Sequence, residues 1–404
     1  MRQRLPVLFL LITVAVDAIG IGIIMPVMPD LLIELGADDL STAATWGGVL
    51  AASFAVMQFL FGPTIGSLSD RFGRRPVLLA SLTVMALDYL VMALASAMWM
   101  LLIARMIGGI TSATQSTASA YMADISDSEK KAQNFGLIGA AFGIGFILGP
   151  LIGGLLGELG PRAPFIAAAA LAGANVAFGW FILTETVTDA IRRPFSWARA
   201  NPVGGLIHVA RLPGLTRLLV ATFFYNVAFF VYPSVWAYYT QERFAWEPSM
   251  VGVSLAVFGA SMALVQGGLI RLVIPRLGEH RTVIAGFTIN ILAFTVYALA
   301  TDGWQIFALA PITSLGIIAG PALQGIMSRT ASDDQQGELQ GVLTSISAIA
   351  IIISPLVMTN TFSFFTRAGT PYYFPGAPFV LSAGLVLLSL LVFAGRARLS
   401  PPAE

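Results

Sequence analysis

The sequence contains no cysteine and only two histidines among its 404 residues. Disulfide bonds, thiol nucleophiles, thiolate metal sites and a histidine cluster are therefore excluded. Charged residues are also scarce, at 11% of the chain, and the formal net charge is +1. Without a large field of one sign, the chain has no means of steering nucleic acid toward itself. We find no nucleophile paired with a base and no metal cluster, so we do not expect an enzyme.

What fills the sequence instead is apolar: 57% of the residues are hydrophobic and the mean hydropathy is +0.82. Soluble domains are only about half apolar and a quarter charged, so the chain is expected to lie in a membrane and to contact lipid. A spanning helix needs about 20 mostly apolar residues. Twelve stretches qualify, which predicts an all-α membrane protein with helices at 5–27, 43–67, 76–96, 99–123, 134–156, 164–184, 216–240, 249–274, 282–301, 304–328, 338–361 and 374–395.

The distribution of basic residues predicts the orientation of these helices. Nearly all loop Lys and Arg residues fall on one side, and the other side has only Arg162, Arg243 and Arg367. Because basic loops stay in the cytoplasm, both termini are expected there. Short loops and the lack of a targeting segment favour a bacterial inner membrane.

An internal repeat divides the chain. The same interval separates Gly73 from Gly278, Gly136 from Gly341, and Pro150 from Pro355. We therefore predict two pseudo-symmetric six-helix bundles, at 1–184 and 216–404, joined by a cytoplasmic linker at 185–215. Within the linker, residues 201–211 form either a short amphipathic helix on the membrane or a flexible connector.

The loop after the second predicted helix combines a glycine, an acid and several arginines over Gly66 to Pro76. Glycine permits close helix approach, and arginines supply fork-shaped donors that can hold a rigid two-state contact. The plainer interpretation is a basic loop that only fixes topology. The loop resembles the signature of the major facilitator superfamily, and the resemblance covers nearly the whole chain. It implies a charge network, with Asp124, that locks the outward-facing state; its signature residues are Gly66, Asp70, Arg71, Gly73, Arg74 and Arg75.

The fifth predicted helix is rich in glycine. Its spacing is similar to the antiporter motif of drug exporters in the same superfamily, which favours export. Glycine removes side chains where helices approach and slide, and proline permits a bend. Ordinary small-residue packing is the alternative. The residues concerned are Gly136, Gly145, Gly149, Pro150, Gly153 and Gly154.

Three charged residues, Asp17, Asp88 and Arg105, fall at membrane depth. A charge at the bilayer centre costs at least about 2.5–3.5 kcal/mol, so such residues mark functional sites or structural ion pairs. Asp17 and Asp88 each lie roughly 18 Å from the cytoplasmic helix end at 1.5 Å per residue. Carboxylates removed from water hold protons more firmly, which suits proton exchange.

Several segments narrow the resemblance to the tetracycline-resistance exporters, which exchange a metal-chelated tetracycline for a proton. They are 17–26, 87–90, 243–246, 251–256 and 321–325. This resemblance implies that Asp17, Asp88 and Arg105 form the proton and drug path and that Gln324 lines the cavity. It also implies no bound cofactor, protons as the coupling ion, and a small-molecule substrate. We expect the protein to act as a monomer.

Two positions depart from that family. Asn290 stands where those exporters carry an acid, and Met262 stands where they carry a histidine, so neither can titrate. Either protons couple through Asp17 and Asp88 alone, or the chain is a metabolite symporter or facilitator on the same scaffold. A membrane receptor without transport activity is a third hypothesis. The candidates for the cavity wall are Gln115, Tyr225, Asn226, Met262, Gln266, Asn290 and Gln324.

Overall fold

The computed structural model describes residues 4–112, 114–126, 130–188, 192, 194, 195, 201, 212, 214–332 and 335–395, and within these ranges all regular structure is helical. The first group of helices is α1 (Arg4–Ile24), α2 (Met28–Glu34), α3 (Leu40–Phe72), α4 (Arg74–Leu94), α5 (Met98–Thr111), α6 (Thr114–Ile125), α7 (Lys131–Gly157) and α8 (Ala163–Ile182). The second group is α10 (Thr216–Phe229), α11 (Val231–Phe244), α12 (Pro248–Leu264), η2 (Val265–Leu269), α13 (Ile270–Leu277), α14 (Glu279–Leu299), α15 (Gly303–Thr313), η3 (Ser314–Ile318), α16 (Ala319–Thr330), α17 (Gln336–Thr366) and α18 (Ala377–Ala394). The predicted linker helix at 201–211 lies outside the described residues, apart from position 201.

Within the described residues, eleven helices are long and apolar enough to cross a membrane. The range predicted as the fourth span, 99–123, contains two shorter helices, α5 and α6, which are interrupted at Ser112. Hydroxyl side chains compete for the backbone there, because Thr111 Oγ1 donates to the carbonyl of Ile107 and Ser112 Oγ donates to that of Gly109. Such bonds weaken a helix by offering its backbone other partners.

The internal repeat extends to the helix interruptions. The interval between Gly73 and Gly278 also separates Ile24, where α1 ends, from Phe229, where α10 ends. The break between α5 and α6 recurs as the 3-10 segment η3. Gly73 (φ 111°) and Gly278 (φ 74°) both adopt a backbone conformation that L side chains rarely adopt. The two sequence repeats therefore share these helix ends and turns, although the π-helical segment η2 has no counterpart in the continuous helix α3.

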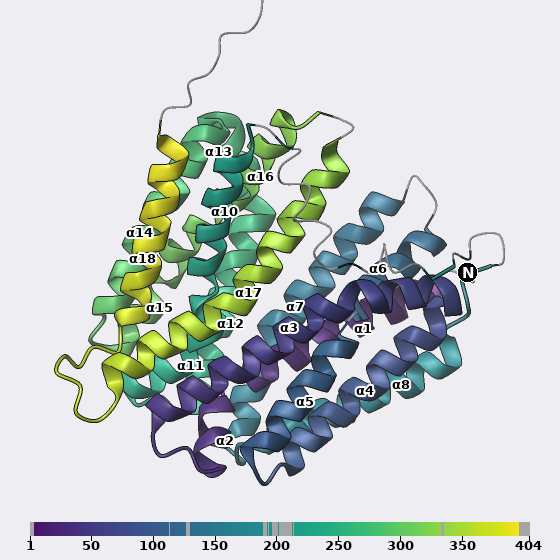
Figure 1. The fold of residues 1–404 in the computed structure, drawn as a ribbon, viewed down its shortest axis with the longest axis horizontal. Coiled ribbons are helices and arrows are strands. Elements are labelled where there is room, and N and C mark those ends of the chain that lie inside the picture. Colours follow the sequence, from purple (N-terminus) through teal and green to yellow (C-terminus); the bar gives the residue numbers. More distant parts are fainter. Residues whose placement is uncertain are drawn as a thin grey trace, which may run out of the picture.

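The helices form two groups that diverge toward one end of the molecule (Figure 1). We call this end, where α8 finishes and α10 begins, the linker face, and the opposite end the α2 face. Within the first group α1 packs on α7 and α4 on α8, and within the second α18 packs on α10 and α14. The groups meet mainly through two helix pairs, α3 with α17 and α7 with α12, and α11 also contacts α3 and α2.

Contacts between the groups are close at the α2 face. Ser41 Oγ of α3 lies 2.8 Å from Ser363 Oγ of α17, one residue donating to the other. Along the second pair, Gly252 of α12 packs directly against the backbone of Pro150 and Gly154 of α7. The groups are thus in contact at the α2 face.

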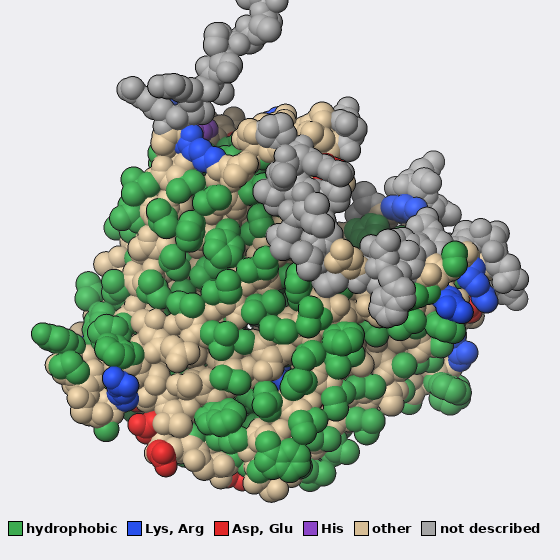
Figure 2. Space-filling model, in the orientation of Figure 1, with side chains coloured by type: hydrophobic (Ala, Val, Ile, Leu, Met, Phe, Trp, Pro, Cys, Tyr) green, Lys and Arg blue, Asp and Glu red, His purple; other side chains and the backbone are tan. Residues whose placement is uncertain are grey.

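The surface has the pattern expected of a membrane protein. Figure 2 shows hydrophobic side chains over most of the visible face, with basic side chains gathered mainly toward the linker face and acidic ones toward the α2 face. Exposed large hydrophobic residues occur on helices of both groups. Since a soluble protein rarely exposes so broad an apolar surface, lipid is the environment that this surface fits.

Candidate functional site

A cavity of about 970 Å³ lies between the two groups, on the linker side of their contacts. Its walls come from α3, the α5–α6 junction, α10, α16 and α17. None of the lining side chains that the structure describes is charged; the polar ones are amides, hydroxyls and the phenol of Tyr225. A mostly apolar wall with a few hydrogen-bonding groups suits an uncharged or zwitterionic small molecule. The lining polar residues are Gln58, Ser112, Ser116, Thr222, Tyr225, Asn226, Gln324, Thr344, Ser345 and Ser347.

Three of the predicted cavity residues line this space: Tyr225, Asn226 and Gln324. Asn226 Nδ2 donates to Ser347 Oγ at 3.1 Å, which links α10 to α17 and orients the amide. Gln58 of α3 also lines the cavity and was not among the sequence candidates. A lone amide in an apolar helix was the available signal, since such a group seeks polar surroundings in a membrane.

Three other predicted cavity residues, Asn290, Met262 and Gln266, are not among the residues that line this space. Asn290 is 1% exposed, and its Nδ2 donates to the carbonyls of Gly286, at 3.0 Å, and Gly316, at 2.8 Å. It therefore ties α14 to η3. Met262 packs against the hydrophobic core, and Gln266 lies in the π-helical segment η2. The side chain of Gln115 is outside the described residues.

The intramembrane charges lie in the first group. Asp88 of α4 and Arg105 of α5 form an ion pair with 2.5 Å between Oδ2 and Nη2. The Asp88 side chain is 2% exposed, and the Arg105 guanidinium stacks on the ring of Phe54 at 5.0 Å. Asp88 Oδ1 and Arg105 Nε are buried, and neither has a hydrogen-bond partner in the described part of the chain. Because Phe54 directly precedes the cavity-lining Ala55, this pair lies close to the α3 wall.

Asp17 is separate from that ion pair. It lies on α1, partly buried and within electrostatic reach of Tyr89 of α4. Among the described residues it has no ion-pair partner, so Arg105 neutralises Asp88 and not Asp17 in this conformation. The two carboxylates predicted to act together thus have different surroundings.

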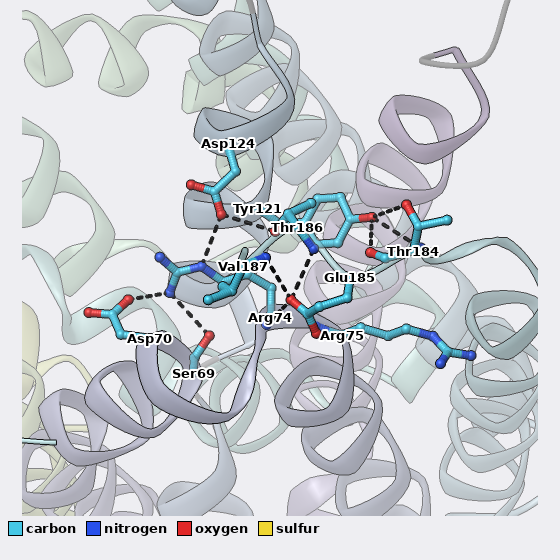
Figure 3. Close-up of polar contacts among 10 residues, drawn as sticks. All are labelled: Ser69, Asp70, Arg74, Arg75, Tyr121, Asp124, Thr184, Glu185, Thr186 and Val187. Carbon is cyan, nitrogen blue, oxygen red and sulfur yellow. Dashed lines mark hydrogen bonds and ion pairs between the residues drawn. The ribbon is translucent and has the colours of Figure 1, made fainter. Parts of the chain in front are cut away.

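The signature loop forms a compact charge cluster (Figure 3). Arg74 pairs with Asp70 at 2.6 Å and with Asp124 of α6 at 3.2 Å, and it also donates to Ser69 Oγ. The positive φ of Gly73 provides the sharp turn that places Arg74 at the start of α4. Of the predicted network, Asp70, Arg74 and Asp124 are therefore in contact.

The remaining signature residues have other positions. Arg71 stacks on Phe72, while Arg75 donates to the carbonyl of Trp180 and stacks on its ring. Gly66 lines the cavity and has open space where a side chain would lie.

Glu185, after α8, completes the cluster, and the sequence reasoning missed it. Its Oε1 accepts from the backbone N–H of Arg74 at 2.9 Å, and its Oε2 accepts from that of Arg75 at 3.3 Å (Figure 3). These are N–H groups at the start of α4 that lack helical partners. A carboxylate at a helix N-terminus also interacts favourably with the helix dipole. Glu185 therefore fixes the end of the first group to the signature loop.

The second group has a counterpart with the charges exchanged. Glu279, at the start of α14, pairs with Arg329 of α16. Arg74 and Glu279 occupy equivalent positions in the two repeats, and so do Asp124 and Arg329. In each half, an ion pair thus joins two equivalent helices at the linker face, but the acid and the base have exchanged positions.

The glycines of α7 form two packing surfaces. Gly145, Gly149 and Gly153 recur every four residues and lie directly against backbone carbonyls of α1. A methyl group at Gly149 would come within 2.7 Å of the carbonyl oxygen of Ile19. Gly154 faces α12 of the other group, and a methyl group there would lie 2.5 Å from the carbonyl oxygen of Pro248. Gly136 faces open space. The helix therefore approaches both groups closely.

Comparisons with known proteins agree with this architecture. The family model of the Major Facilitator Superfamily matches residues 10–355. The class C tetracycline resistance protein of Escherichia coli is 39% identical over 96% of each chain, and the class B protein of the same organism is 38% identical over 86% of each. The solved structure of the human organic anion transporter MFSD10 (TETRAN) has a TM-score of 0.68 and 25% identity, covering 97% of this chain and 99% of its own. The nucleoside transporter NupG, at 14% identity and a TM-score of 0.74, shares the fold over 96% of this chain and 98% of its own.

Proposed function

The chain belongs to the major facilitator superfamily and is an integral membrane protein, and from that premise we propose that it exports tetracycline-like amphipathic molecules in exchange for protons. The observation that carries the proposal is the uncharged cavity between the two groups, closed at the α2 face by the Ser41–Ser363 contact. Alternating access requires such a site, which one rearrangement can open to the opposite side.

We propose that the linker face is cytoplasmic, since the basic loops lie there and basic residues favour that side. In this assignment α5 and α6 together form the fourth span, which gives twelve spans and places both termini in the cytoplasm. The bundles at 1–184 and 216–404 are the two moving bodies, and 185–215 links them. Non-helical backbone at Ser112 is tolerable in the membrane because it lines the cavity. The structure then represents the inward-open state of a monomeric transporter in a bacterial inner membrane.

We propose that protons pass through the first group. Asp17 and Asp88 are the carboxylates at membrane depth, and protonation of Asp88 would remove its charge from the pair with Arg105. Leaving a buried charge unpaired is costly, so proton binding and the position of Arg105 should be coupled. Asn290 binds two backbone carbonyls and stabilises helix packing instead. No resident metal or cofactor is needed in this scheme, and a metal ion would enter only as part of a chelated substrate.

The signature cluster would then serve as the cytoplasmic gate. In the inward-open state, Arg74 binds Asp70 and Asp124 within one half. We propose that, when the halves meet at the linker face, the same cluster presents a preformed charged surface to the other half and locks the outward-facing state. Because the cluster is rigid, we expect the linker face to be either open or closed, without intermediate arrangements.

Everted membrane vesicles provide the test of this function. We expect a proton gradient, acidic inside, to drive tetracycline into vesicles that contain the wild-type protein. The Asp17→Asn, Asp88→Asn double variant should lose this uptake, while Asp38→Asn, which changes an exposed acid, should retain it. Wild-type uptake by the double variant would overturn the proton path. Tetracycline movement that ignores the gradient would favour a facilitator instead.

A further inference from the structure

The contact between the halves at the outer α2 face contains acidic residues that the transport path does not use. Asp30 of α2 accepts a hydrogen bond from Gln241 Nε2 of α11, at 3.4 Å, across the boundary between the halves. Glu158, just beyond α7, accepts from the backbone N–H of Ser249 of α12, at 3.2 Å, across the same boundary. We call Asp30, Glu158, Tyr238, Gln241 and Ser249 the outer seam. Both acids come from the first half, and both partners come from the second.

A buried hydroxyl completes the outer seam. Tyr238 of α11 is 5% exposed, its hydroxyl has no hydrogen-bond partner among the described residues, and it lies within electrostatic reach of Asp30. The hydroxyl packs against Gly47 of α3, where any side chain would collide with it. A buried hydroxyl without a hydrogen-bond partner costs free energy, and a protonated Asp30 nearby would be a neutral neighbour for it.

We propose that the outer seam is a second proton-binding site, in which Asp30 takes up a proton from the outer solution as the halves close there. Closure covers Asp30 with α11 of the second half and removes it from water, and its repulsion with Glu158 of the same half grows as water is excluded, so two negative charges there are disfavoured. A proton on Asp30 removes the repulsion and turns the carboxyl into a donor.

The electrostatics of the closed seam agree with this assignment. Burial raises the pKa of Asp30, the hydrogen bond from Gln241 lowers it, and repulsion by Glu158 raises it, so that the net shift is upward. A group with a raised pKa in the closed state stabilises that state fully below its ordinary pKa near 4 and stops doing so as the pH rises through the raised value. Outer acidity should therefore favour a closed outer seam.

Neighbouring charged groups do not supply a cation to Asp30. Arg162 binds Glu34 and the carbonyl of Ala93, and Arg243 donates to the carbonyl of Ala300. At the α2 end of α3 and α11, the other charged groups that the structure describes are acids: Asp39, which caps α3, and Glu242, which binds Tyr373. The electrostatic field around Asp30 thus favours the protonated form of its carboxyl group.

In an exchanger, this site would promote closure of the outer face after the drug has left, because the outer solution is the acidic side. This consequence rests on the proposed function, whereas the protonation itself does not require a substrate.

Distance measurements between two spin labels test the proposal. Ser96 and Tyr372 are exposed at the α2 face, in different halves, and the natural chain has no cysteine to add background. With cysteines at these two positions, double electron–electron resonance reports the ratio of closed to open outer seams in detergent. We expect this ratio to fall as the pH rises from 4 to 8, by up to about tenfold per pH unit. The Asp30→Asn variant should stay closed throughout, since the amide is neutral.

Three further variants sharpen the test. Asp38→Asn, in the adjacent loop, should follow the parent, and Asp17→Asn should keep the pH dependence, which separates this site from the midplane. Glu158→Gln should move the midpoint to lower pH because it removes the repulsion. A parent ratio that does not change with pH, or an Asp30→Asn ratio that changes as steeply as the parent's, would overturn the proposal. Drug uptake is not part of this measurement, so its loss or persistence tests the proposed function separately.

Discussion

Glu279 and Arg329 form an ion pair at the linker face, at the positions where the other repeat has Arg74 and Asp124. Acid and base have changed places between the halves, while the attraction between the two helix ends has been kept. Because an ion pair works in either direction, the identity of each partner matters less than the pairing. The C-terminal half therefore has an equivalent ion pair, which a search for the arginine of the signature loop would miss.

This relationship predicts that the charges can be exchanged. Arg329→Glu places two acids together and should reduce transport, whereas the double variant Glu279→Arg, Arg329→Glu should restore most of it. The expected effect on stability is only about 0–1 kcal/mol, because Arg329 is 67% exposed. Transport assays on the single and double variants provide the measurement. Arg281→Glu, which changes a different arginine on α14, is the control. A double variant no better than the single one would contradict this.

The glycines of α7 should differ sharply in their tolerance of alanine. Gly149→Ala would press a methyl group against the backbone of α1, and overpacking of this kind typically costs about 1–3 kcal/mol. Gly143→Ala, on the same helix, meets open space and should be neutral or slightly stabilising. Thermal unfolding in detergent compares the two variants, and equal unfolding temperatures would refute the packing role assigned to Gly149.

Asp88 and Arg105 should show strong energetic coupling. Asp88→Ala leaves a largely buried guanidinium without its carboxylate, which typically costs about 3–5 kcal/mol. Removing both charges in the Asp88→Ala, Arg105→Ala variant should cost clearly less than the sum of the single changes. A double-mutant cycle on unfolding free energies measures this, and additive effects would show that the pair contributes nothing as a pair.

Cavity residues and packing residues should respond differently to substitution. Gln324→Leu removes an amide from the cavity wall and should raise the apparent KM for tetracycline, with little change in unfolding temperature. Asn290→Leu removes the two amide hydrogen bonds that tie α14 to η3 and should lower the unfolding temperature, since a typical hydrogen bond contributes about 0.5–1.5 kcal/mol. The opposite pattern would exchange the roles proposed for these two residues.

Sequence patterns predicted the parts of the fold that depend on composition. Long apolar runs predicted the eleven described helices that are long and apolar enough to cross a membrane, and the recurrence of Gly73 at Gly278 predicted the repeat, because residue types alone carry both signals. Local patterns did not reveal the break at Ser112, where hydroxyl groups compete for helix carbonyls beside a cavity formed only in the folded protein. The same limit applies to Glu185, whose role depends on a contact with α4 more than a hundred positions away.

The site was predicted in part for a similar reason. Gln324 and Asn226 line the cavity as expected, since amides in apolar helices seek polar surroundings. Asn290 has an equally conspicuous sequence position, yet its amide serves two backbone carbonyls. Helix periodicity alone does not separate an amide that faces a cavity from one that binds a neighbouring helix.

Alternating access, the central claim, is tested most directly by locking the contact between Ser41 and Ser363 at the α2 face. Their hydroxyl oxygens are 2.8 Å apart, close enough for cysteines at these positions to form a disulfide. In everted vesicles, the Ser41→Cys, Ser363→Cys variant should accumulate tetracycline when reduced, stop when oxidised, and recover on reduction. Either single-cysteine variant should be indifferent to oxidation. Undiminished uptake by fully cross-linked protein would contradict the account, because substrate would then be crossing while the outer face remains closed.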